Sequence, residues 1–271
     1  MRATSFCVCG ALYCLFRKIC FSLLKIPKVV NLIIEQGNTA TKVAVYDQGQ
    51  NKASFMYKDF NCELLAPLFE QYDLTYGILS SVIGIDARMV ACLEKRLKRL
   101  LQLTPDTALP IRIGYDTPHT LGNDRLAAAV GAYTLQPGRT LLVIDAGTAI
   151  TYELVEASGL YVGGNISPGM ATRFKALHHY TKKLPLVSEQ EEIPLMATNT
   201  VAAIQAGVVN GLVYEIDGYI DALQAKYSDL FVFLTGGHSF YLQGRLKNRI
   251  FADINLVLTG LNRILEYNVE N

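Results

Sequence analysis

Two stretches of the chain share one pattern, in which an apolar segment runs into an acidic residue and then a glycine turn. The first is Leu32-Ile33-Ile34-Glu35-Gln36-Gly37-Asn38-Thr39, and the second is Leu142-Val143-Ile144-Asp145-Ala146-Gly147-Thr148-Ala149. Each continues as a further apolar segment, so the pattern predicts two strand–turn–strand units. A carboxylate at a strand end can hold a hydrated metal ion, and glycine lets backbone N–H groups approach a phosphate. The duplicated turn therefore predicts a nucleotide held between two similar halves.

The remaining hydrophobic pattern predicts an α/β protein in two parts. Short β-branched segments at residues 29–34, 41–46 and 53–57 indicate an antiparallel meander. Apolar residues at helical spacing predict helices at residues 61–72, 86–101, 123–135, 170–183, 198–223 and 255–267. Residues 163–169 are expected to form a glycine-rich loop. Pro137-Gly138 is the expected boundary, which places a first half at residues 29–138 and a second half at residues 139–271.

Composition and charge favour a globular protein with a small-molecule ligand. Hydrophobic residues make up 51% of the 271 positions, which is enough for substantial cores. The net charge of +1 and the pI near 7.6 provide no broad basic field for nucleic acid. Four of the six cysteines lie within the first twenty residues, and Cys62 and Cys92 stand apart. Because their spacing is not that of a zinc site, we expect free thiols in a reducing compartment.

Residues 1–28 resemble a signal peptide only in part. Arg2 is followed by apolar residues as far as Phe16, and Arg17 and Lys18 then end the run. Such a run is too short to span a bilayer, and no small-residue cleavage site followed by polar sequence is evident. We expect a mis-assigned start codon or a loosely ordered extension, and no membrane contact. Secretion is the alternative interpretation.

Phosphate binding has no single diagnostic motif in this chain. Neither a Walker A sequence nor the dinucleotide-binding glycine fingerprint occurs. The candidates are three separate glycine turns, at residues 36–39, 146–148 and 235–237. Taken singly, each is typical of an ordinary turn at a strand end. Their spacing across two similar halves is what favours a nucleotide site.

Asp124 and Arg125 are the candidates for acid–base chemistry. They fall in the first turn of the predicted helix at residues 123–135, just after Gly122. Free N–H groups and the helix dipole stabilise a carboxylate at this position. From the pattern alone, an ordinary charge pair at a helix start is the simpler interpretation. Surface, turn or packing roles are the interpretation for the remaining candidates, which are His178, His179, His238, Tyr152 and Tyr161.

Six sequence blocks occur in a recognisable order. They are Gly37-Asn38-Thr39-x-x-Lys42, Tyr115 with Gly122-x-Asp124-Arg125, Asp145-x-Gly147-Thr148-Ala149, Gly163-Gly164-x-Ile166-x-Pro168-Gly169, Asn199-Thr200 and Thr235-Gly236-Gly237. In order and spacing these blocks closely resemble the type III pantothenate kinases. That family belongs to the superfamily of acetate and sugar kinases, heat-shock chaperones and actin. The resemblance runs from about residue 30 to the C-terminus.

The resemblance implies a fold, a reaction and its cofactors. The fold would be two ribonuclease-H-like, or actin-like, halves, each a mixed sheet flanked by helices, with the active site in the cleft between them. The reaction would be ATP-dependent phosphorylation of pantothenate to 4'-phosphopantothenate, the first step of coenzyme A biosynthesis. Magnesium for ATP, a monovalent cation (potassium or ammonium), a homodimer and a cytoplasmic location follow from the same resemblance.

The resemblance also implies site residues, by motif position. Asp124 would accept the proton of the substrate hydroxyl, Asp145 would bind the monovalent cation, and Thr148 would contact ATP. The pantothenate contacts would be Tyr115, Gly122, Asn123, Arg125 and Thr200. The first phosphate-binding loop would comprise Glu35, Gln36, Gly37, Asn38, Thr39 and Lys42. Phosphoryl transfer needs positioning and charge neutralisation more than a strong base, so an ionised Asp124 suffices. Arg125 offers a planar fork for the pantothenate carboxylate.

Glu35 departs from the family pattern, which has aspartate there. The extra methylene moves the carboxylate by roughly 1.5 Å, and misplacement on that scale can cost about a hundredfold in rate. A contact through water tolerates the longer arm, because hydrated magnesium keeps several waters. Three interpretations remain open: an active pantothenate kinase, a weakened or inactive homologue that binds nucleotide or pantothenate in a regulatory role, and a related kinase for another small hydroxylated substrate.

Overall fold

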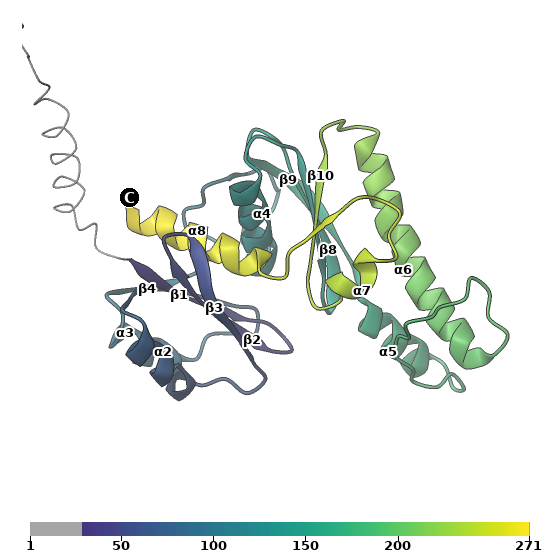
Figure 1. The fold of residues 1–271 in the computed structure, drawn as a ribbon, viewed down its shortest axis with the longest axis horizontal. Coiled ribbons are helices and arrows are strands. Elements are labelled where there is room, and N and C mark those ends of the chain that lie inside the picture. Colours follow the sequence, from purple (N-terminus) through teal and green to yellow (C-terminus); the bar gives the residue numbers. More distant parts are fainter. Residues whose placement is uncertain (1–28, 271) are drawn as a thin grey trace, which may run out of the picture.

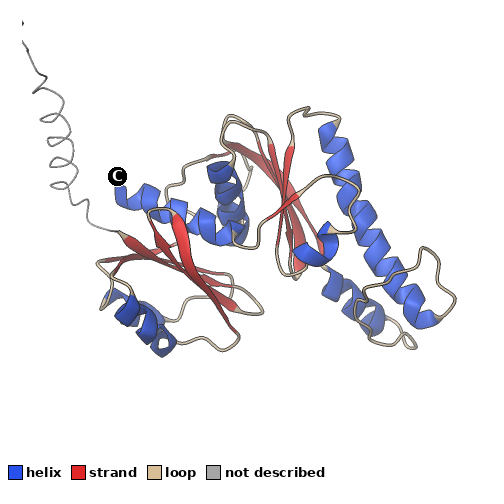
Figure 2. Ribbon diagram, in the orientation of Figure 1, coloured by secondary structure: helices blue, strands red, loops and turns tan. Residues whose placement is uncertain are grey.

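Helices and sheets alternate in layers across the molecule (Figure 1). The computed structural model describes residues 29–270, so the expectations for residues 1–28 lie outside the described part. One sheet carries helices α2 (Ala66–Gln71) and α3 (Ala87–Glu94) on its outer face, and the second carries α5 (Met170–Tyr180) and α6 (Thr200–Gln224) on its outer face (Figure 2). Helices α4 (Asn123–Leu135) and α8 (Leu256–Glu270) lie between the two sheets. Each sheet is thereby covered on both faces, as the 51% hydrophobic content allows.

The first sheet contains the predicted meander. Its strands are β1 (Val30–Gln36), β2 (Thr41–Asp47), β3 (Gln50–Tyr57), β4 (Leu74–Ser81) and β5 (Arg99–Gln102), in the order β3-β2-β1-β4-β5. β1, β2 and β3 pair antiparallel, which confirms the prediction, and β4 and β5 add parallel. The outer layer comprises η1 (Cys62–Leu65), α2 (Ala66–Gln71) and α3 (Ala87–Glu94). Asn61 caps this layer's first turn, where its side chain accepts from the N–H groups of Glu63 and Leu64.

The second sheet repeats this arrangement with the second copy of the strand–turn–strand unit. Its strands are β6 (Arg112–Ile113), β7 (Leu141–Ala146), β8 (Ala149–Val155), β9 (Leu160–Pro168), β10 (Phe231–Thr235) and β11 (Phe251–Ala252), in the order β11-β10-β7-β8-β9-β6. The helices that follow are α5 (Met170–Tyr180), α6 (Thr200–Gln224) and α7 (Ser239–Gln243), and η2 (Pro118–Thr120) precedes α4. β7, β8 and β9 again form an antiparallel meander.

The central helices α4 and α8 cross at close range because both carry glycine at the crossing. A Cβ on Gly260 would lie 1.8 Å from the carbonyl oxygen of Ala127, and one on Gly131 would lie 2.2 Å from that of Leu256. The pair buries apolar side chains of both sheets, such as Ile33 of β1. This central layer connects the sheets and fixes the position of the N-terminus of α4.

Two elements cross the expected boundary at Pro137-Gly138. β6 precedes the boundary but pairs with β9 of the second sheet, and α8 follows it but packs on α4 and the first sheet. All strands of the first sheet precede the boundary, and all strands of the second sheet except β6 follow it.

Two predicted elements are wrong in type. Residues 163–169 are not a loop, because Leu160–Pro168 forms strand β9 along β8. Gly164 has no room for a Cβ, which would lie 1.9 Å from the carbonyl oxygen of Tyr152. The predicted helix at 86–101 ends at Glu94, and Arg99–Gln102 pairs with β4 as strand β5. Sheet pairing outweighs the helical spacing of the leucines, which is a weak local preference.

The expectation of free thiols is wrong for Cys62 and Cys92, which form a disulfide. It joins η1 to α3 in the outer layer of the first sheet. The two cysteines are 30 positions apart, and no spacing rule indicated their contact. The other four cysteines lie outside the described residues.

Within residues 29–270, no helix is both long and apolar enough to cross a bilayer.

Candidate active site

The duplicated turn forms the same structure twice, as predicted. After β1, residues 37–40 make a turn in which the N–H of Gly37 donates to the carbonyl of Ala40. After β7, the N–H of Gly147 donates to the carbonyl of Ala149. Glu35 and Asp145 therefore each occupy the second-last position of a central strand. Asn38, Thr39 and Thr148 are exposed at the tips of the turns, where a ligand can reach them.

Asp145 lies close enough to two other predicted site residues, Glu35 and Asp124, for their charges to act on it. Lys42 lies opposite Glu35 in the β1–β2 ladder, and its Nζ is 3.3 Å from Glu35 Oε2. Burial raises the pKa of Asp145 to about 6, with Asp124 and Glu35 raising it further and Lys42 opposing them. The structure thus brings the predicted metal, phosphate and catalytic groups together from both sheets and from α4.

The third glycine turn also reaches Asp145. Thr235 ends β10 directly beside Asp145, its partner in the parallel ladder. Gly236 follows with a φ of 91°, and a Cβ there would lie 2.4 Å from Asp145 Oδ1. His238 then donates its backbone N–H to the carbonyl of Ala146. All three turns predicted for nucleotide binding therefore lie at strand ends, and two of them are adjacent.

Asp124 lies in the first turn of α4, as the sequence predicted. Gly122 occupies the N-cap without a side chain to satisfy the helix end. Asp124 Oδ1 accepts the backbone N–H of Arg125 at 2.8 Å, and the free N–H groups of the helix end stabilise its charge. Asn123 is committed to the fold, because its side chain donates to the carbonyl of Leu103 at 3.0 Å.

Arg125 does not offer its fork to solvent, in contrast to the expectation for the pantothenate carboxylate. Its Nε and Nη2 donate to Glu153 Oε1 and Oε2 at 2.7 and 2.8 Å, and Nη2 is 3.1 Å from the hydroxyl of Tyr161. Tyr115 lies beside this network, with its ring centroid 5.8 Å from Arg125 Cζ. Burial lowers the pKa of Arg125, but hydrogen bonding and charge from Glu153 outweigh it and raise the pKa.

Glu153 is the main residue that the sequence interpretation missed. Its side chain is 0% exposed, and burial raises its pKa although Arg125 and Tyr161 stabilise its charge. A glutamate inside the otherwise apolar strand Ala149–Val155 was the available signal, because buried charges in proteins are paired. Tyr161, interpreted as strand packing, belongs to the same network.

The Thr148 turn is held in place by the start of α5. The carbonyl of Thr148 accepts both the N–H of Gly169 at 3.1 Å and the hydroxyl of Thr172 at 2.7 Å. Arg173 in turn donates from Nε to the carbonyl of Pro168 at 2.8 Å. The block Pro168-Gly169 therefore orients a turn and does not itself form a ligand loop.

Thr200 is the predicted site residue that the structure does not bring to the others. It is exposed at the start of α6, capped by Asn199, whose side chain accepts the N–H of Ala202 at 2.9 Å. α6 packs on the outer face of the second sheet, whereas α4 packs on the inner face (Figure 1). Within one chain, Thr200 and Asp124 are therefore on opposite sides of that sheet.

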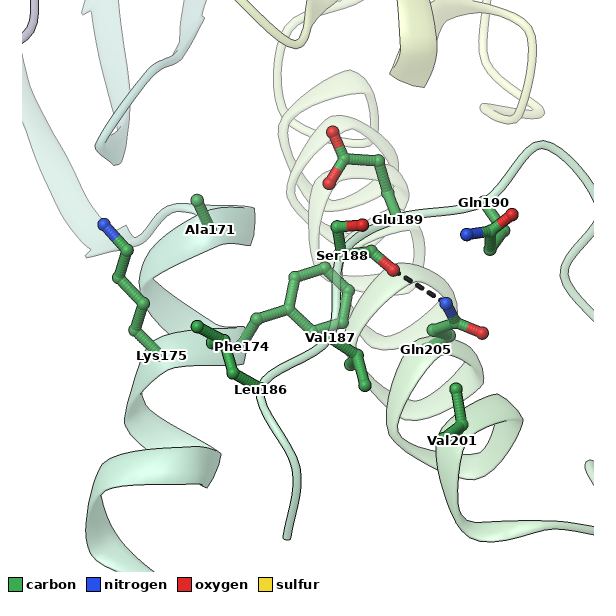
Figure 3. A pocket seen from close by; sticks show the side chains of 10 residues that line it. All are labelled: Ala171, Phe174, Lys175, Leu186, Val187, Ser188, Glu189, Gln190, Val201 and Gln205. Carbon is green, nitrogen blue, oxygen red and sulfur yellow. Dashed lines mark hydrogen bonds between the residues drawn. The ribbon is translucent and has the colours of Figure 1, made fainter.

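A pocket of about 530 Å³ lies beside Thr200, between α5 and α6. Figure 3 shows Phe174 of α5 pointing toward α6, which contributes Val201 and Gln205, with Gln205 donating to the carbonyl of Ser188. Five of the ten residues that line it are apolar, and the other five are polar or charged. The pocket is separated from Asp124 by the second sheet, so it is not the site at which Asp124 acts in this chain.

Comparison with known proteins decides the family. The family model for type III pantothenate kinases matches residues 31–222. A type III pantothenate kinase from Phocaeicola vulgatus is 47% identical over 239 residues, which cover 88% of this chain and 99% of the relative. One from Bacteroides fragilis strain YCH46 is also 47% identical, covering 88% and 98%. The chain belongs to the type III pantothenate kinases.

Solved structures agree with the fold of this kinase. A putative Baf family transcriptional activator from Campylobacter jejuni has a TM-score of 0.57 at 22% identity, covering 89% of this chain and 100% of that one. A putative 2-dehydro-3-deoxygalactonokinase from Sinorhizobium meliloti has a TM-score of 0.55 at 14% identity, covering 88% and 99%. The predicted fold class, two actin-like α/β halves, is confirmed.

The kinase offers no direct cage for a metal ion in the part of the chain that the structure describes. No group of three or more His, Cys, Asp and Glu residues is arranged there to hold one. The buried oxygens Gln36 Oε1 and Thr235 Oγ1 nevertheless lack a hydrogen-bond partner among the described residues, and Glu35 Oε2 has only its ion pair with Lys42. Thr235 pairs with Asp145 in the parallel ladder, and Gln36 ends β1 next to Glu35. They fit hydrated magnesium, which keeps most of its waters and needs one or two carboxylates.

Proposed function

We propose that this kinase uses Asp124 to accept the proton of the terminal hydroxyl of pantothenate while ATP donates its γ-phosphoryl group. The kinase phosphorylates pantothenate in the first step of coenzyme A biosynthesis, by its family membership. The observation that carries the proposed role is the position of Asp124 at the N-terminus of α4, in electrostatic contact with Asp145. Asp124 would therefore activate the substrate hydroxyl next to the groups proposed to bind the phosphates.

ATP would lie across the two copies of the turn. Gln36, Gly37, Asn38 and Thr39 would approach its phosphates from the first sheet, and Thr148 from the second. Lys42 would add positive charge for phosphoryl transfer, since it pairs with Glu35 and its charge acts to lower the pKa of Asp145. Glu35 would hold hydrated magnesium through water, and the ion would neutralise charge on the phosphates.

A monovalent cation, potassium or ammonium, would bind at Asp145. The support is electrostatic: Asp145 is buried beside two further carboxylates, which raises its pKa to about 6. A bound cation would offset that repulsion and keep Asp145 ionised. The pantothenate pocket would be formed by Tyr115, Gly122, Asn123 and Arg125, with Arg125 using the nitrogen that Glu153 does not occupy.

A coupled assay with ATP, magnesium, potassium and pantothenate tests the proposal against the alternatives raised by Glu35. We expect turnover by the wild type and a loss of up to about a hundredfold in Glu35→Asp. The reason is that the shorter arm withdraws from Lys42 and misplaces the carboxylate. No turnover by the wild type, with recovery in Glu35→Asp, would favour a weakened regulatory homologue. A panel of other hydroxylated acceptors, with Asp124→Asn as the inactive control, tests for a different substrate.

We further propose that the kinase is a homodimer in which Thr200 of one chain completes the pantothenate site of the other. The support is the position of Thr200, on the opposite side of the second sheet from Asp124 in its own chain. Co-expression of Asp124→Asn and Thr200→Glu chains tests this. Each variant alone is expected to be inactive, and the mixture should recover about a quarter of wild-type activity, because mixed dimers retain one intact site. A stable monomer by light scattering, or no recovery, would contradict the shared site.

The proposed location is the cytoplasm, and it rests on ATP as the substrate. The Cys62–Cys92 disulfide weighs against it, because such bonds are rare in reducing compartments.

A further inference from the structure

A buried network of Arg125, Glu153 and Tyr161 lies directly behind Asp124, and the proposed reaction gives no role to two of its members. Glu153 is 0% exposed, and both of its oxygens accept from Arg125, at 2.7 and 2.8 Å. The hydroxyl of Tyr161 donates to Glu153 and is 3.1 Å from Arg125 Nη2. The network joins α4, which carries Asp124, to β8 and β9 of the second sheet.

The strand register makes the space for this network. Gly164 is the partner of Glu153 in the β8–β9 ladder. A Cβ on Gly164 would lie 2.5 Å from Glu153 Oε2 and 2.6 Å from Arg125 Nη2, and 1.9 Å from the carbonyl oxygen of Tyr152. Glycine at this position therefore lets the guanidinium and the carboxylate meet beneath the strand. Because the pair of Arg125 and Glu153 requires glycine at position 164, it is a buried feature of the fold and not a chance surface contact.

The network fixes the orientation of the guanidinium through one of its edges. Nε and Nη2 of Arg125 are committed to Glu153, so Nη1 is the nitrogen left to approach a substrate. The ring of Tyr115 lies near the same guanidinium, with its centroid 5.8 Å from Arg125 Cζ. An unrestrained arginine loses rotamer freedom when it binds a ligand, and a pre-oriented one does not. Glu153 holds Arg125 by two hydrogen bonds, so the guanidinium keeps one orientation.

We propose that Glu153, supported by Tyr161, is a positioning residue that orients Arg125 toward the carboxylate of pantothenate and so sets the preference of the kinase for an acidic substrate. This inference rests on the proposed contact between Arg125 and pantothenate. It assigns the glutamate of β8 and the glycine opposite it to substrate selection as well as to folding.

The experiment compares kcat/KM for pantothenate with kcat/KM for its primary carboxamide, in the wild type and in Glu153→Gln. Glutamine keeps the size of the side chain but turns an amide N–H toward an N–H of Arg125, which releases the guanidinium. We expect the KM for pantothenate to rise about tenfold, since a charge-assisted contact of this kind contributes on that order. The KM for ATP and the kcat/KM for the carboxamide should change less than about threefold, so the preference for the acid falls about tenfold.

Two further variants keep the test decisive. Glu215→Gln is the matched control, because Glu215 also pairs with an arginine and a tyrosine, Arg173 and Tyr152, but on the outer face of the second sheet. It should leave the preference for the acid unchanged. Tyr161→Phe keeps the ring and removes only the hydroxyl, and it should lower the preference by about threefold in the same direction. If Glu153→Gln does not fold, Tyr161→Phe decides the question.

Equal losses on the acid and the carboxamide would overturn the inference, because a merely structural residue affects both substrates alike. Arg125→Lys separates this failure from a failure of the proposed site. If Arg125→Lys leaves the preference unchanged, the contact between Arg125 and pantothenate is wrong. If Arg125→Lys lowers it and Glu153→Gln does not, only the positioning role is wrong. In the Arg125→Lys background, Glu153→Gln should change the preference less than about twofold, since coupled residues are not additive.

Discussion

Asp124→Asn is expected to lower kcat by about 10²- to 10⁴-fold, the range for loss of a general base. Asparagine cannot take the proton of the pantothenate hydroxyl. In the wild type, Asp124 Oδ1 accepts the backbone N–H of Arg125 at 2.8 Å. The amide Oδ1 of asparagine can accept the same bond, so the start of α4 should be retained. The coupled assay gives kcat, and calorimetry gives the dissociation constant for pantothenate, which should change less than about threefold.

Asp106→Asn is the control for Asp124→Asn, because it makes the same chemical change at an exposed loop position. It should retain full activity. The role of Asp124 would be contradicted by a folded Asp124→Asn enzyme that keeps more than about a tenth of the wild-type kcat. A loss of pantothenate binding equal to the loss of kcat would instead indicate a binding role.

Gly260→Ala is expected to lower the free energy of unfolding by roughly 3 kcal/mol or more. The new Cβ would lie 1.8 Å from the carbonyl oxygen of Ala127 and 2.8 Å from the backbone nitrogen of Gly131. These are main-chain atoms, so no change of rotamer relieves the clash, and α8 has to move away from α4. Urea unfolding should show a lower midpoint, and activity should fall because α4 carries Asp124.

Gly218→Ala is the matched control in another helix. Gly218 is exposed in α6, and a Cβ there would meet no other atom within 4 Å. Alanine is a better helix former, so this change should raise the free energy of unfolding by about 0.5–1 kcal/mol. The opposite signs of two identical substitutions are the result to check. If both variants shift the midpoint in the same direction, the close crossing of α4 and α8 does not control stability.

Local pattern was enough to predict the elements that bury apolar residues in a regular order. β1 and β2 lie within two residues of their predicted bounds, and α4 begins and ends at the predicted residues. Such segments satisfy their own backbone groups and bury one clear face, so their type is decided locally. Where distant backbone pairing competes, as for β5 and β9, the local pattern was misleading.

The sequence by itself determined the duplicated turn, the family, and the residues that its motifs mark for chemistry. Only the tertiary structure decided which of those residues meet. It joined Glu35, Asp124 and Asp145 from three separate elements, placed Thr200 on the far side of the second sheet, and committed the fork of Arg125 to Glu153. The Cys62–Cys92 bond was decided in the same way. The physical reason is that a contact between distant residues depends on strand register and helix crossing, such as Glu153 opposite Gly164 and Gly131 against Gly260, which no local pattern specifies.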